Sequence, residues 1–301
     1  MKVNLSIIVV SFNTKDITLS CLDSVIKHTR GVSYEIIVVD NGSKDGSLQA
    51  LKEYSKNNQA VTLINPGVNL GFGRANNLGV SNSSGDYILF LNSDTLLIDN
   101  ALKEVVDFVS NRKDLGVYTC RLLNLDRSIQ PSGGHFPNLP NLFAWQFFID
   151  DIPFIGNLIP SFHPQASTYD KDKKLDWVTG AFMVIPRKVF DLVGGFDENI
   201  FMYTEEMELA YRISNLNYKT YLKKSPSIVH LGGASGGSHL ALTSEIKYML
   251  YFWKKHKPRW QLPLVRFAFF CGSLLRWLLF GIIKGDEKSR KTYSEALKFL
   301  I

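Results

Sequence analysis

The amino-acid sequence predicts an α/β fold with a mainly parallel central sheet, followed by a C-terminal helical extension. Residues 5–10 and 35–39 are nearly continuous runs of β-branched residues, typical of strands that are buried on both faces of a parallel sheet. Between them, the apolar residues of 16–28 recur at helical spacing. A strand, a helix and a second strand in this order make one βαβ unit.

The alternation of helices and strands continues along the first 122 residues. Thr14 stands directly before the first helix, where we expect it to act as the cap. The same patterns predict further helices at 47–54, 76–80 and 100–109, and further strands at 61–64, 87–91 and 116–122.

The second half of the sequence is less regular. Residues 126–174 are rich in Pro, Gly and aromatic side chains without clear periodicity, and we expect an irregular insertion there. Order returns with a strand at 176–185 closed by Pro186, helices at 188–193 and 204–215, and a strand at 227–230. We expect one domain over 1–240, with a nucleotide-binding half at 1–125 and an acceptor half at 126–240, and a separate extension at 241–301.

Composition sets broad limits on function. The 301 residues are 45% hydrophobic and 21% charged, which excludes a disordered chain. A net charge of +6 suits nucleic acid, an anionic membrane or a negatively charged substrate. Cys21, Cys120 and Cys271 lack the paired spacing of a disulfide framework or a zinc cluster. With no signal-peptide pattern at the N-terminus, we expect a cytoplasmic protein.

Polar residues follow three of the predicted strands, at 11–13, 40–42 and 92–94. Ligands of open α/β sheets bind at the carboxyl ends of the strands, so these residues predict a nucleotide pocket. Ordinary polar loops are the alternative.

Seven short segments carry a more specific signal through their order and spacing. They are Ser11-Phe12-Asn13, Val38-Val39-Asp40-Asn41-Gly42-Ser43, residues 69–77, Leu91-Asn92-Ser93-Asp94-Thr95, Thr179-Gly180-Ala181, Gly194-Gly195-Phe196-Asp197-Glu198 and His230. Together they resemble family 2 glycosyltransferases of the GT-A fold, and most closely the rhamnosyltransferase-like branch. The resemblance covers about residues 5–238. It implies an inverting enzyme that transfers a sugar from a nucleotide-diphosphate donor to a hydroxyl of a glycan.

In this family the acid after the second strand contacts the nucleobase or ribose, which places that role on Asp40. A helix cap is the alternative for Asp40. Gly71 and Arg74 stand at a helix start, where backbone N–H groups and a guanidinium can meet diphosphate oxygens, although Arg74 can equally be a solvated helix residue. The resemblance assigns the other nucleotide contacts to Ser11, Asn13, Asn69, Asn76 and Ser93.

The metal motif of this fold has two acids flanking one residue, and here Asn92-Ser93-Asp94 keeps only the second. The resemblance implies that Asp94 binds Mg²⁺ or Mn²⁺ together with the donor diphosphate, water and the imidazole of His230. The alternatives are a turn-capping role for Asp94 and a structural role for His230.

An acidic pair after an aromatic stretch supplies the catalytic base in this family. Glu205 and Glu206 occupy that place, so Glu206 matches the base, with Glu in place of the usual Asp. Charge that complements the helix dipole is the alternative for both, and Glu205 can instead orient the acceptor. The resemblance places Trp177, Thr179, Gly180 and Ala181 beside the sugar and acceptor, with a core position as the alternative for Trp177.

The C-terminal tail differs in composition from the rest of the sequence. Residues 248–260 mix aromatic and basic side chains, and 262–283 are strongly apolar apart from Arg266 and Arg276. Two arginines make a membrane crossing expensive, so we expect an interfacial hairpin or amphipathic helix, peripheral on the inner face of the plasma membrane. Packing of the tail on its own domain, or on the partner in a homodimer, is the alternative.

Donor and acceptor follow only from the resemblance. It favours dTDP-rhamnose, ahead of UDP-galactose, UDP-galactofuranose or a UDP-hexosamine, and a polysaccharide or lipid-linked glycan as acceptor. A sugar nucleotidyltransferase should have a Gly-rich loop after the first strand, and residues 11–14 contain no Gly. A non-catalytic glycan-binding or nucleic-acid-binding module would have no use for Asp94, Glu206 and His230, and we expect no nucleic-acid partner.

Overall fold

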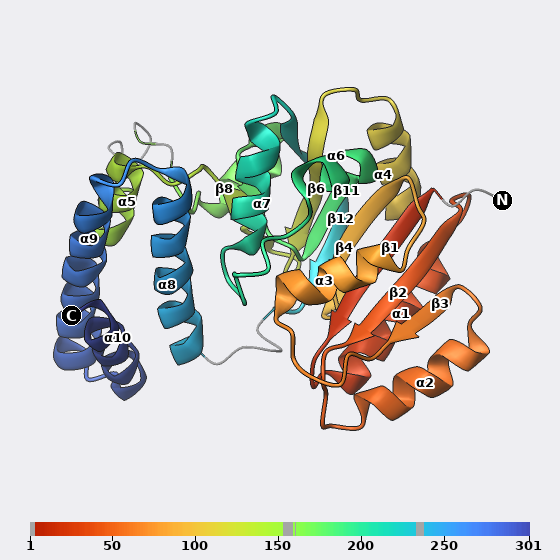
Figure 1. Ribbon diagram of the computed structural model, residues 1–301, viewed down its shortest axis with the longest axis horizontal. Coiled ribbons are helices and arrows are strands. Elements are labelled where there is room, and N and C mark those ends of the chain that lie inside the picture. Colours follow the sequence, from red (N-terminus) through yellow and green to blue (C-terminus); the bar gives the residue numbers. More distant parts are fainter. Residues whose placement is uncertain (1–3, 153–158, 160, 233–237) are drawn as a thin grey trace. The chain divides into compact units, whose positions relative to one another are not determined.

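The computed structural model describes residues 4–152, 159, 161–232 and 238–301. The chain forms two compact units (Figure 1). The first comprises residues 1–133, 165–201 and 205–235, and the second comprises 134–164, 202–204 and 236–301. The second unit thus combines a segment from the middle of the sequence with the C-terminal tail.

A mixed sheet of ten strands forms the centre of the first unit. Along the sheet the strands run β3-β2-β1-β4-β11-β6-β12-β5, and β7 and β9 pair with β6 and β12. β1 to β4 are parallel, β11 is antiparallel to both its neighbours, and β12 is parallel to β6. The bounds are β1 Leu5–Ser11, β2 Tyr34–Asp40, β3 Val61–Ile64, β4 Tyr87–Asn92, β5 Thr95–Leu96, β6 Leu115–Leu123, β7 Ile129–Gln130, β9 Lys173–Leu175, β11 Phe182–Pro186 and β12 Lys219–His230.

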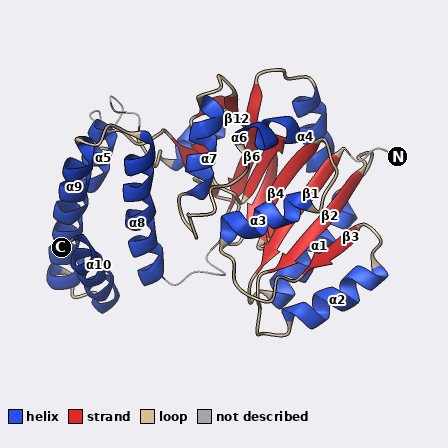
Figure 2. Cartoon of the chain, viewed as in Figure 1, coloured by secondary structure: helices blue, strands red, loops and turns tan. Residues whose placement is uncertain are grey.

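Helices cover both faces of this sheet (Figure 2). One buried cluster joins α1 (Lys15–His28), α2 (Ser47–Asn57) and α4 (Ala101–Ser110) to one face of the strands, and another joins α3 (Phe72–Ser81), α6 (Arg187–Val193) and α7 (Glu205–Ser214) to the other. Successive residues of β1 alternate between the clusters, with Ile7 in the first and Ile8 in the second. This explains the continuous apolar runs and confirms the predicted α/β class with a mainly parallel sheet.

Most predicted elements are present, with four corrections in the first unit. The strand predicted at 227–230 is only the end of β12, which begins eight residues earlier, at Lys219. Thr14 precedes α1, but its side chain makes no capping hydrogen bond and contacts the hydroxyl of Thr18 instead. α3 begins at Phe72, four residues before the predicted start. The predicted strand at 176–185 is two strands, β10 (Trp177–Val178) and β11, because the chain leaves the ladder between them.

The predicted irregular insertion contains regular structure. Besides β7, β8 (Gly133–Gly134), a 3₁₀ helix (η2, Ala166–Asp170) and β9, it includes the helix α5 (Leu139–Gln146). Asn138 and Asn141 form a reciprocal capping box at its start, and Pro140 lies in its first turn. A proline there needs no N–H partner, so Pro140 helps to begin the helix rather than breaking it.

Apart from Gly134 of β8, the described regular structure of the second unit is helical. α5 is joined by α8 (Ser238–His256), α9 (Gln261–Arg276), a π-helical segment (η3, Trp277–Ile283) and α10 (Glu287–Leu300). α9 lies so close to α5 that a Cβ at Gly272 would overlap Gln146. By length and composition, the helical stretch Gln261–Ile283 could cross a membrane, as could the core helices of some soluble proteins.

Candidate active site

Three strand ends bring the predicted nucleotide residues to one edge of the sheet. In the ladder, Ser11 stands opposite Asp40, and Val10 stands opposite Asn92. The loops after β1, β2 and β4 therefore start side by side, as the parallel topology requires.

Asp40 is the most unusual of these residues. Its side chain is buried, at 1% exposure, and neither carboxylate oxygen has a hydrogen-bond partner among the described residues. The alternative role as helix cap is wrong, because Asp45 accepts from the Ser47 amide at the start of α2. A buried carboxylate without partners is costly, and it leaves Asp40 with two unused acceptor oxygens. Hydrogen bonds to them from a pyrimidine N–H or ribose hydroxyls stay a prediction.

The loop around Asn69 is held by the protein itself. Asn69 Oδ1 accepts from Asn41 Nδ2 at 3.0 Å and from the Gly71 amide at 2.9 Å. Gly71 has a φ of +82°, and a Cβ there would overlap the carbonyl of Phe201, so only glycine fits. Asn41 was not among the predicted site residues, although it stands in the Asp40-Asn41-Gly42-Ser43 motif.

Other predicted nucleotide residues also make contacts within the chain. Asn13 has a φ of +53°, and its Oδ1 accepts from the Lys44 amide at 2.7 Å, which joins the loops after β1 and β2. The Ser11 hydroxyl contacts that of Thr18 at 2.9 Å, and the Ser93 hydroxyl contacts that of Thr14 at 3.3 Å. These contacts fix the positions of the loops after β1, β2 and β4.

Arg74 and Asn76 lie on α3 and not at a strand end. Arg74 Nε donates to the backbone oxygen of Glu198 at 2.9 Å and lies 3.7 Å from its carboxylate, and both side chains are about half exposed. Asn76 is buried and donates to the Phe72 carbonyl of its own helix. Contacts from Arg74 or Asn76 to a nucleotide stay predictions.

The structure brings Asp94 and His230 together, as the sequence predicted. Asp94 Oδ1 lies 3.1 Å from His230 Nε2, and both side chains are largely buried. β5 pairs with the end of β12, placing His230 opposite Thr95, and the Leu231 amide donates to the Asp94 carbonyl at 2.8 Å. The described residues contain no group of three His, Cys, Asp or Glu side chains that could hold a metal.

A second contact of His230, with Gln130, favours a metal-binding role for the imidazole. His230 Nδ1 lies 2.6 Å from Gln130 Oε1, while Gln130 Nε2 donates to Asn124 Oδ1 at 3.0 Å. The amide oxygen can only accept, so Nδ1 donates to it, and Nε2 faces Asn92 Nδ2 and the Asp94 carboxylate. This donor set fits a divalent cation that takes its other ligands from diphosphate and water. Gln130 was missed because its sequence neighbourhood has no recognisable motif.

Glu206 lies at the start of α7 beside the segment that separates β10 from β11. Its Oε1 accepts from the Gly180 amide at 3.0 Å. Burial raises the pKa of this carboxyl, while the Glu206 and Gly180 amides act in the opposite direction. A Cβ at Gly180 would crowd both this carboxylate and the Phe72 ring, which explains the glycine. A carboxylate with a raised pKa is suited to accept a proton near neutral pH.

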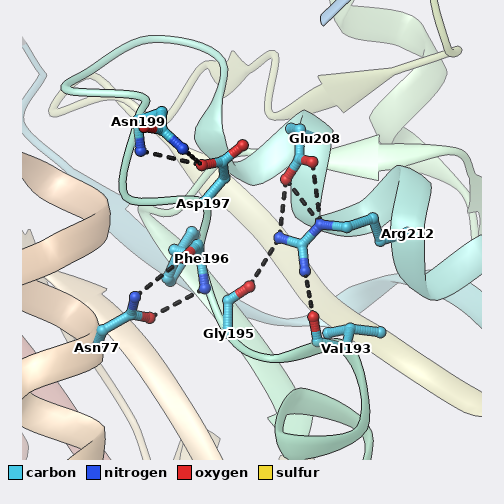
Figure 3. Close-up of polar contacts among 8 residues, drawn as sticks. All are labelled: Asn77, Val193, Gly195, Phe196, Asp197, Asn199, Glu208 and Arg212. Carbon is cyan, nitrogen blue, oxygen red and sulfur yellow. Dashed lines mark hydrogen bonds and ion pairs between the residues drawn. The ribbon is translucent and has the colours of Figure 1, made fainter. Parts of the chain in front are cut away.

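The other acids of α7 differ from Glu206. Glu205 is buried. Glu208 is fully buried and forms a bidentate pair with Arg212, at 3.0 and 2.9 Å from Nε (Figure 3). Arg212 also donates to the carbonyls of Val193 and Gly195, which fixes the Gly-rich turn after α6. Glu208 therefore has a structural partner on its own helix and is more than a complement to the helix dipole.

The predicted sugar and acceptor residues lie around the break between β10 and β11. The Thr179 amide donates to the Ser132 carbonyl at 3.0 Å, and the Ala181 carbonyl accepts from the Asn92 amide at 3.1 Å, next to the metal motif. Trp177 is 8% exposed, which agrees with the core alternative, and its contact with a sugar stays a prediction.

Comparisons with known proteins identify the family of the chain. The family model described as glycosyl transferase family 2 matches residues 6–173. The chain is 30% identical to rhamnosyltransferase WbbL of Escherichia coli (strain K12) over 216 residues, covering 69% of this chain and 76% of WbbL. It is 26% identical to the N-acetylglucosaminyl-diphospho-decaprenol L-rhamnosyltransferase of Mycobacterium tuberculosis (strain ATCC 25618 / H37Rv) over 244 residues, covering 76% of this chain and 78% of that protein.

Solved structures share the fold. The mannosyltransferase PcManGT from Pyrobaculum calidifontis, in complex with GDP-Man and Mn²⁺, superposes with a TM-score of 0.58 at 13% identity over 99% of this chain and 75% of its own. GalNAc-T7 with UDP, GalNAc and Mn²⁺ gives a TM-score of 0.59 at 18% identity over 84% of this chain and 50% of its own. The predicted GT-A fold is thereby confirmed. By its family match and its rhamnosyltransferase relatives, the chain belongs to glycosyl transferase family 2 and is a glycosyltransferase.

Proposed function

We propose that this glycosyltransferase moves one sugar, with inversion, from a nucleotide-diphosphate donor to a hydroxyl of a glycan acceptor, with Glu206 as the base. The observation that carries the proposal is the position of Glu206, whose carboxylate is held by the Gly180 amide and whose pKa is raised by burial. A carboxylate in this state can accept a proton without being fully solvated.

The transfer forms one bond, breaks one bond and moves one proton to Glu206. The acceptor oxygen forms a bond to the anomeric carbon as the bond from that carbon to the diphosphate oxygen breaks. The hydroxyl proton passes to Glu206, and the electron pair of the broken bond leaves with the nucleoside diphosphate. Attack and departure on opposite faces of the sugar produce inversion.

Asp94 and His230 would hold the divalent cation, Mg²⁺ or Mn²⁺. When bound, the cation would stabilise the negative charge of the departing diphosphate. Gln130 keeps the Nδ1 proton of His230 in place and so leaves Nε2 free as a ligand. Asp40 would accept hydrogen bonds from the nucleoside part of the same donor.

The donor we propose is dTDP-rhamnose, since the relatives named above are rhamnosyltransferases. UDP-galactose, UDP-galactofuranose and a UDP-hexosamine are the alternatives. The name of the mycobacterial relative describes a lipid-linked acceptor, and a lipid-linked glycan or polysaccharide is the acceptor class we propose for this chain. Such an acceptor would bring the protein to the cytoplasmic face of the plasma membrane.

The test combines binding with transfer. A thermal-shift panel of dTDP-rhamnose and UDP-sugars, each with and without Mn²⁺ or Mg²⁺, identifies the donor through metal-dependent stabilisation. With that donor, we expect Glu206→Gln to keep the thermal shift and to lose transfer by about 10²–10⁴-fold. Asp191→Asn changes an exposed acid of α6 and is the matched control. Transfer at the wild-type rate by Glu206→Gln would refute the role of Glu206 as base.

A further inference from the structure

An exposed apolar stripe runs along α9 and continues into the π-helical segment η3. Its side chains recur at intervals that keep them on one helical face, and each is between 37% and 65% exposed. The stripe consists of Trp260, Leu264, Phe267, Leu274, Leu278 and Ile282. A contiguous apolar surface of this length marks an interaction site rather than ordinary surface variation.

The two arginines within this apolar segment donate hydrogen bonds to backbone carbonyls of the second unit. Arg266 Nη2 donates to the Leu300 carbonyl of α10 at 3.1 Å. Arg276 donates to the carbonyls of Trp145 and Gln146 at 2.8 and 2.7 Å, at the end of α5. The helix dipole makes that end of α5 favourable for a cation. Neither arginine belongs to the stripe, which contains no charged residue.

The positive charge of the chain is concentrated around the stripe in the sequence. Residues 242–301 contain twelve Lys and Arg against four Asp and Glu, a net charge of +8, whereas residues 1–241 carry a net charge of −2. Exposed basic residues stand before the stripe, at Lys254 and Arg259, and after it, at Lys284 and Lys288. An apolar face bounded at both ends by cations is complementary to an anionic lipid surface.

We propose that the apolar stripe docks this protein on an anionic bilayer, with α9 and η3 lying in the plane of the interface. The opposite face of α9 buries Val265, Ala268 and Phe269 within the second unit, so only the stripe is free to enter the lipid. A crossing would draw the polar helix α10, which packs against α9, into hydrocarbon. A second copy of the chain is a poorer occupant, because two segments of charge +8 repel each other.

Docking would bring the enzyme to a lipid-linked acceptor. Only this role of the docking surface rests on the proposed function. The test uses the full chain and vesicles of phosphatidylcholine, with or without phosphatidylglycerol. We expect sedimentation with the anionic vesicles alone, and release at high salt. The double variant Phe267→Ser with Leu274→Ser should lower the partition coefficient by about tenfold or more, because two apolar side chains no longer enter the lipid.

The matched control is Leu125→Ser with Leu192→Ser, which alters two apolar side chains of the first unit that are 70% and 62% exposed. It should bind vesicles like the wild type, and circular dichroism should show that both double variants are folded. Equal binding to neutral vesicles, no binding, or resistance to alkaline extraction from the bilayer would overturn the in-plane anionic docking. A dimer in sedimentation equilibrium that the stripe variant abolishes would instead identify a second copy as the occupant.

The proposed function is tested separately by the donor-induced thermal shift of the stripe variant, measured without vesicles. We expect this shift to equal that of the wild type. If vesicle binding holds and no donor shifts either protein, the docking surface stands and the proposed donor chemistry fails. If a donor shifts both proteins and vesicle binding fails, the proposed donor chemistry stands and the docking surface fails.

Discussion

At the scale of one residue, Asp40 lowers the stability of the folded protein. Its two carboxylate oxygens are buried and have no protein partner among the described residues. We expect Asp40→Asn to raise the free energy of unfolding of the ligand-free protein by about 1–2 kcal/mol, because a buried charge is removed. Nucleotide affinity should fall by about 10–100-fold, because a charged hydrogen-bond acceptor is lost.

Urea denaturation and isothermal titration with the donor nucleotide measure these two effects. Asp191→Asn is the control for the change from acid to amide at an exposed site. If Asp40→Asn lost stability and kept its nucleotide affinity, Asp40 would be a structural acid.

The raised pKa of Glu206 predicts how stability depends on pH. Between its unfolded pKa and its raised folded pKa, the folded protein holds the proton more tightly than the unfolded chain, so stability falls as pH rises through this window. Gln cannot ionise, so we expect Glu206→Gln to unfold at a higher temperature than the wild type at pH 7. The difference should disappear below about pH 4.5. Thermal unfolding across pH 4–8 measures it, and a constant difference would contradict the effect of burial.

Gln130 contacts His230 Nδ1, and we propose that it positions the imidazole. We expect Gln130→Leu to weaken Mn²⁺ binding by about 10–100-fold, since the imidazole loses the acceptor that fixes its tautomer. Gln130→Glu keeps an acceptor at the same distance and should restore most of the affinity. Electron paramagnetic resonance of free Mn²⁺, with donor nucleotide present, gives the affinity without relying on turnover. Equal affinity in all three proteins would leave Gln130 with a structural role only.

These residues show what the sequence predicts about the site. Asp94 and His230 were identified from motifs 136 positions apart because each follows or ends a recognisable strand. Gln130 was not, because its contact with His230 depends on the pairing of β7 with β6 inside a stretch without periodicity. The orphaned oxygens of Asp40 depend on the packing around them, which no local pattern encodes.

At the scale of elements, strands were predicted better than the insertion. β3 has the predicted bounds, since a short β-branched run between turn residues has few other solutions. The break between β10 and β11 was missed because Thr179 to Ala181 interrupt an otherwise apolar run without a proline. α5 was missed because Pro140 indicates a loop unless Asn138 is recognised as a cap three residues before Asn141.

The Glu208–Arg212 pair predicts a coupling between α7 and the turn after α6. Glu208 is fully buried, so Arg212→Leu leaves a buried carboxylate without its cation, and we expect a loss of about 3–5 kcal/mol in unfolding free energy. The double variant Glu208→Leu with Arg212→Leu should lose less, because the uncompensated charge is gone. Urea denaturation of both single variants and the double variant completes the cycle, and additive losses would show that the pair is not coupled.

At the scale of the whole molecule, the two units are built from different parts of the sequence. The first unit holds the family motifs from Ser11 to His230, whereas the second joins residues 134–164 to the tail. The tail was predicted as an extension from its composition alone, and that composition gave no sign that α5 packs against it. The division into a domain at 1–240 and a separate extension at 241–301 stays a prediction. The contacts of α5 with the tail allow a direct test of it.

We expect a chain ending at His256 to be insoluble or to lose the ordered structure of α5. α5 would lose both α9, which packs closely at Gly272, and the Arg276 guanidinium that binds its terminal carbonyls. The stripe variant Phe267→Ser with Leu274→Ser changes only exposed side chains of α9 and should stay soluble with near wild-type unfolding. Hydrogen exchange of residues 139–146 in the full chain and in the truncated chain measures the effect. Unchanged protection of α5 after truncation would mean that this helix folds without the tail, and that residues 241–301 are an independent appendage.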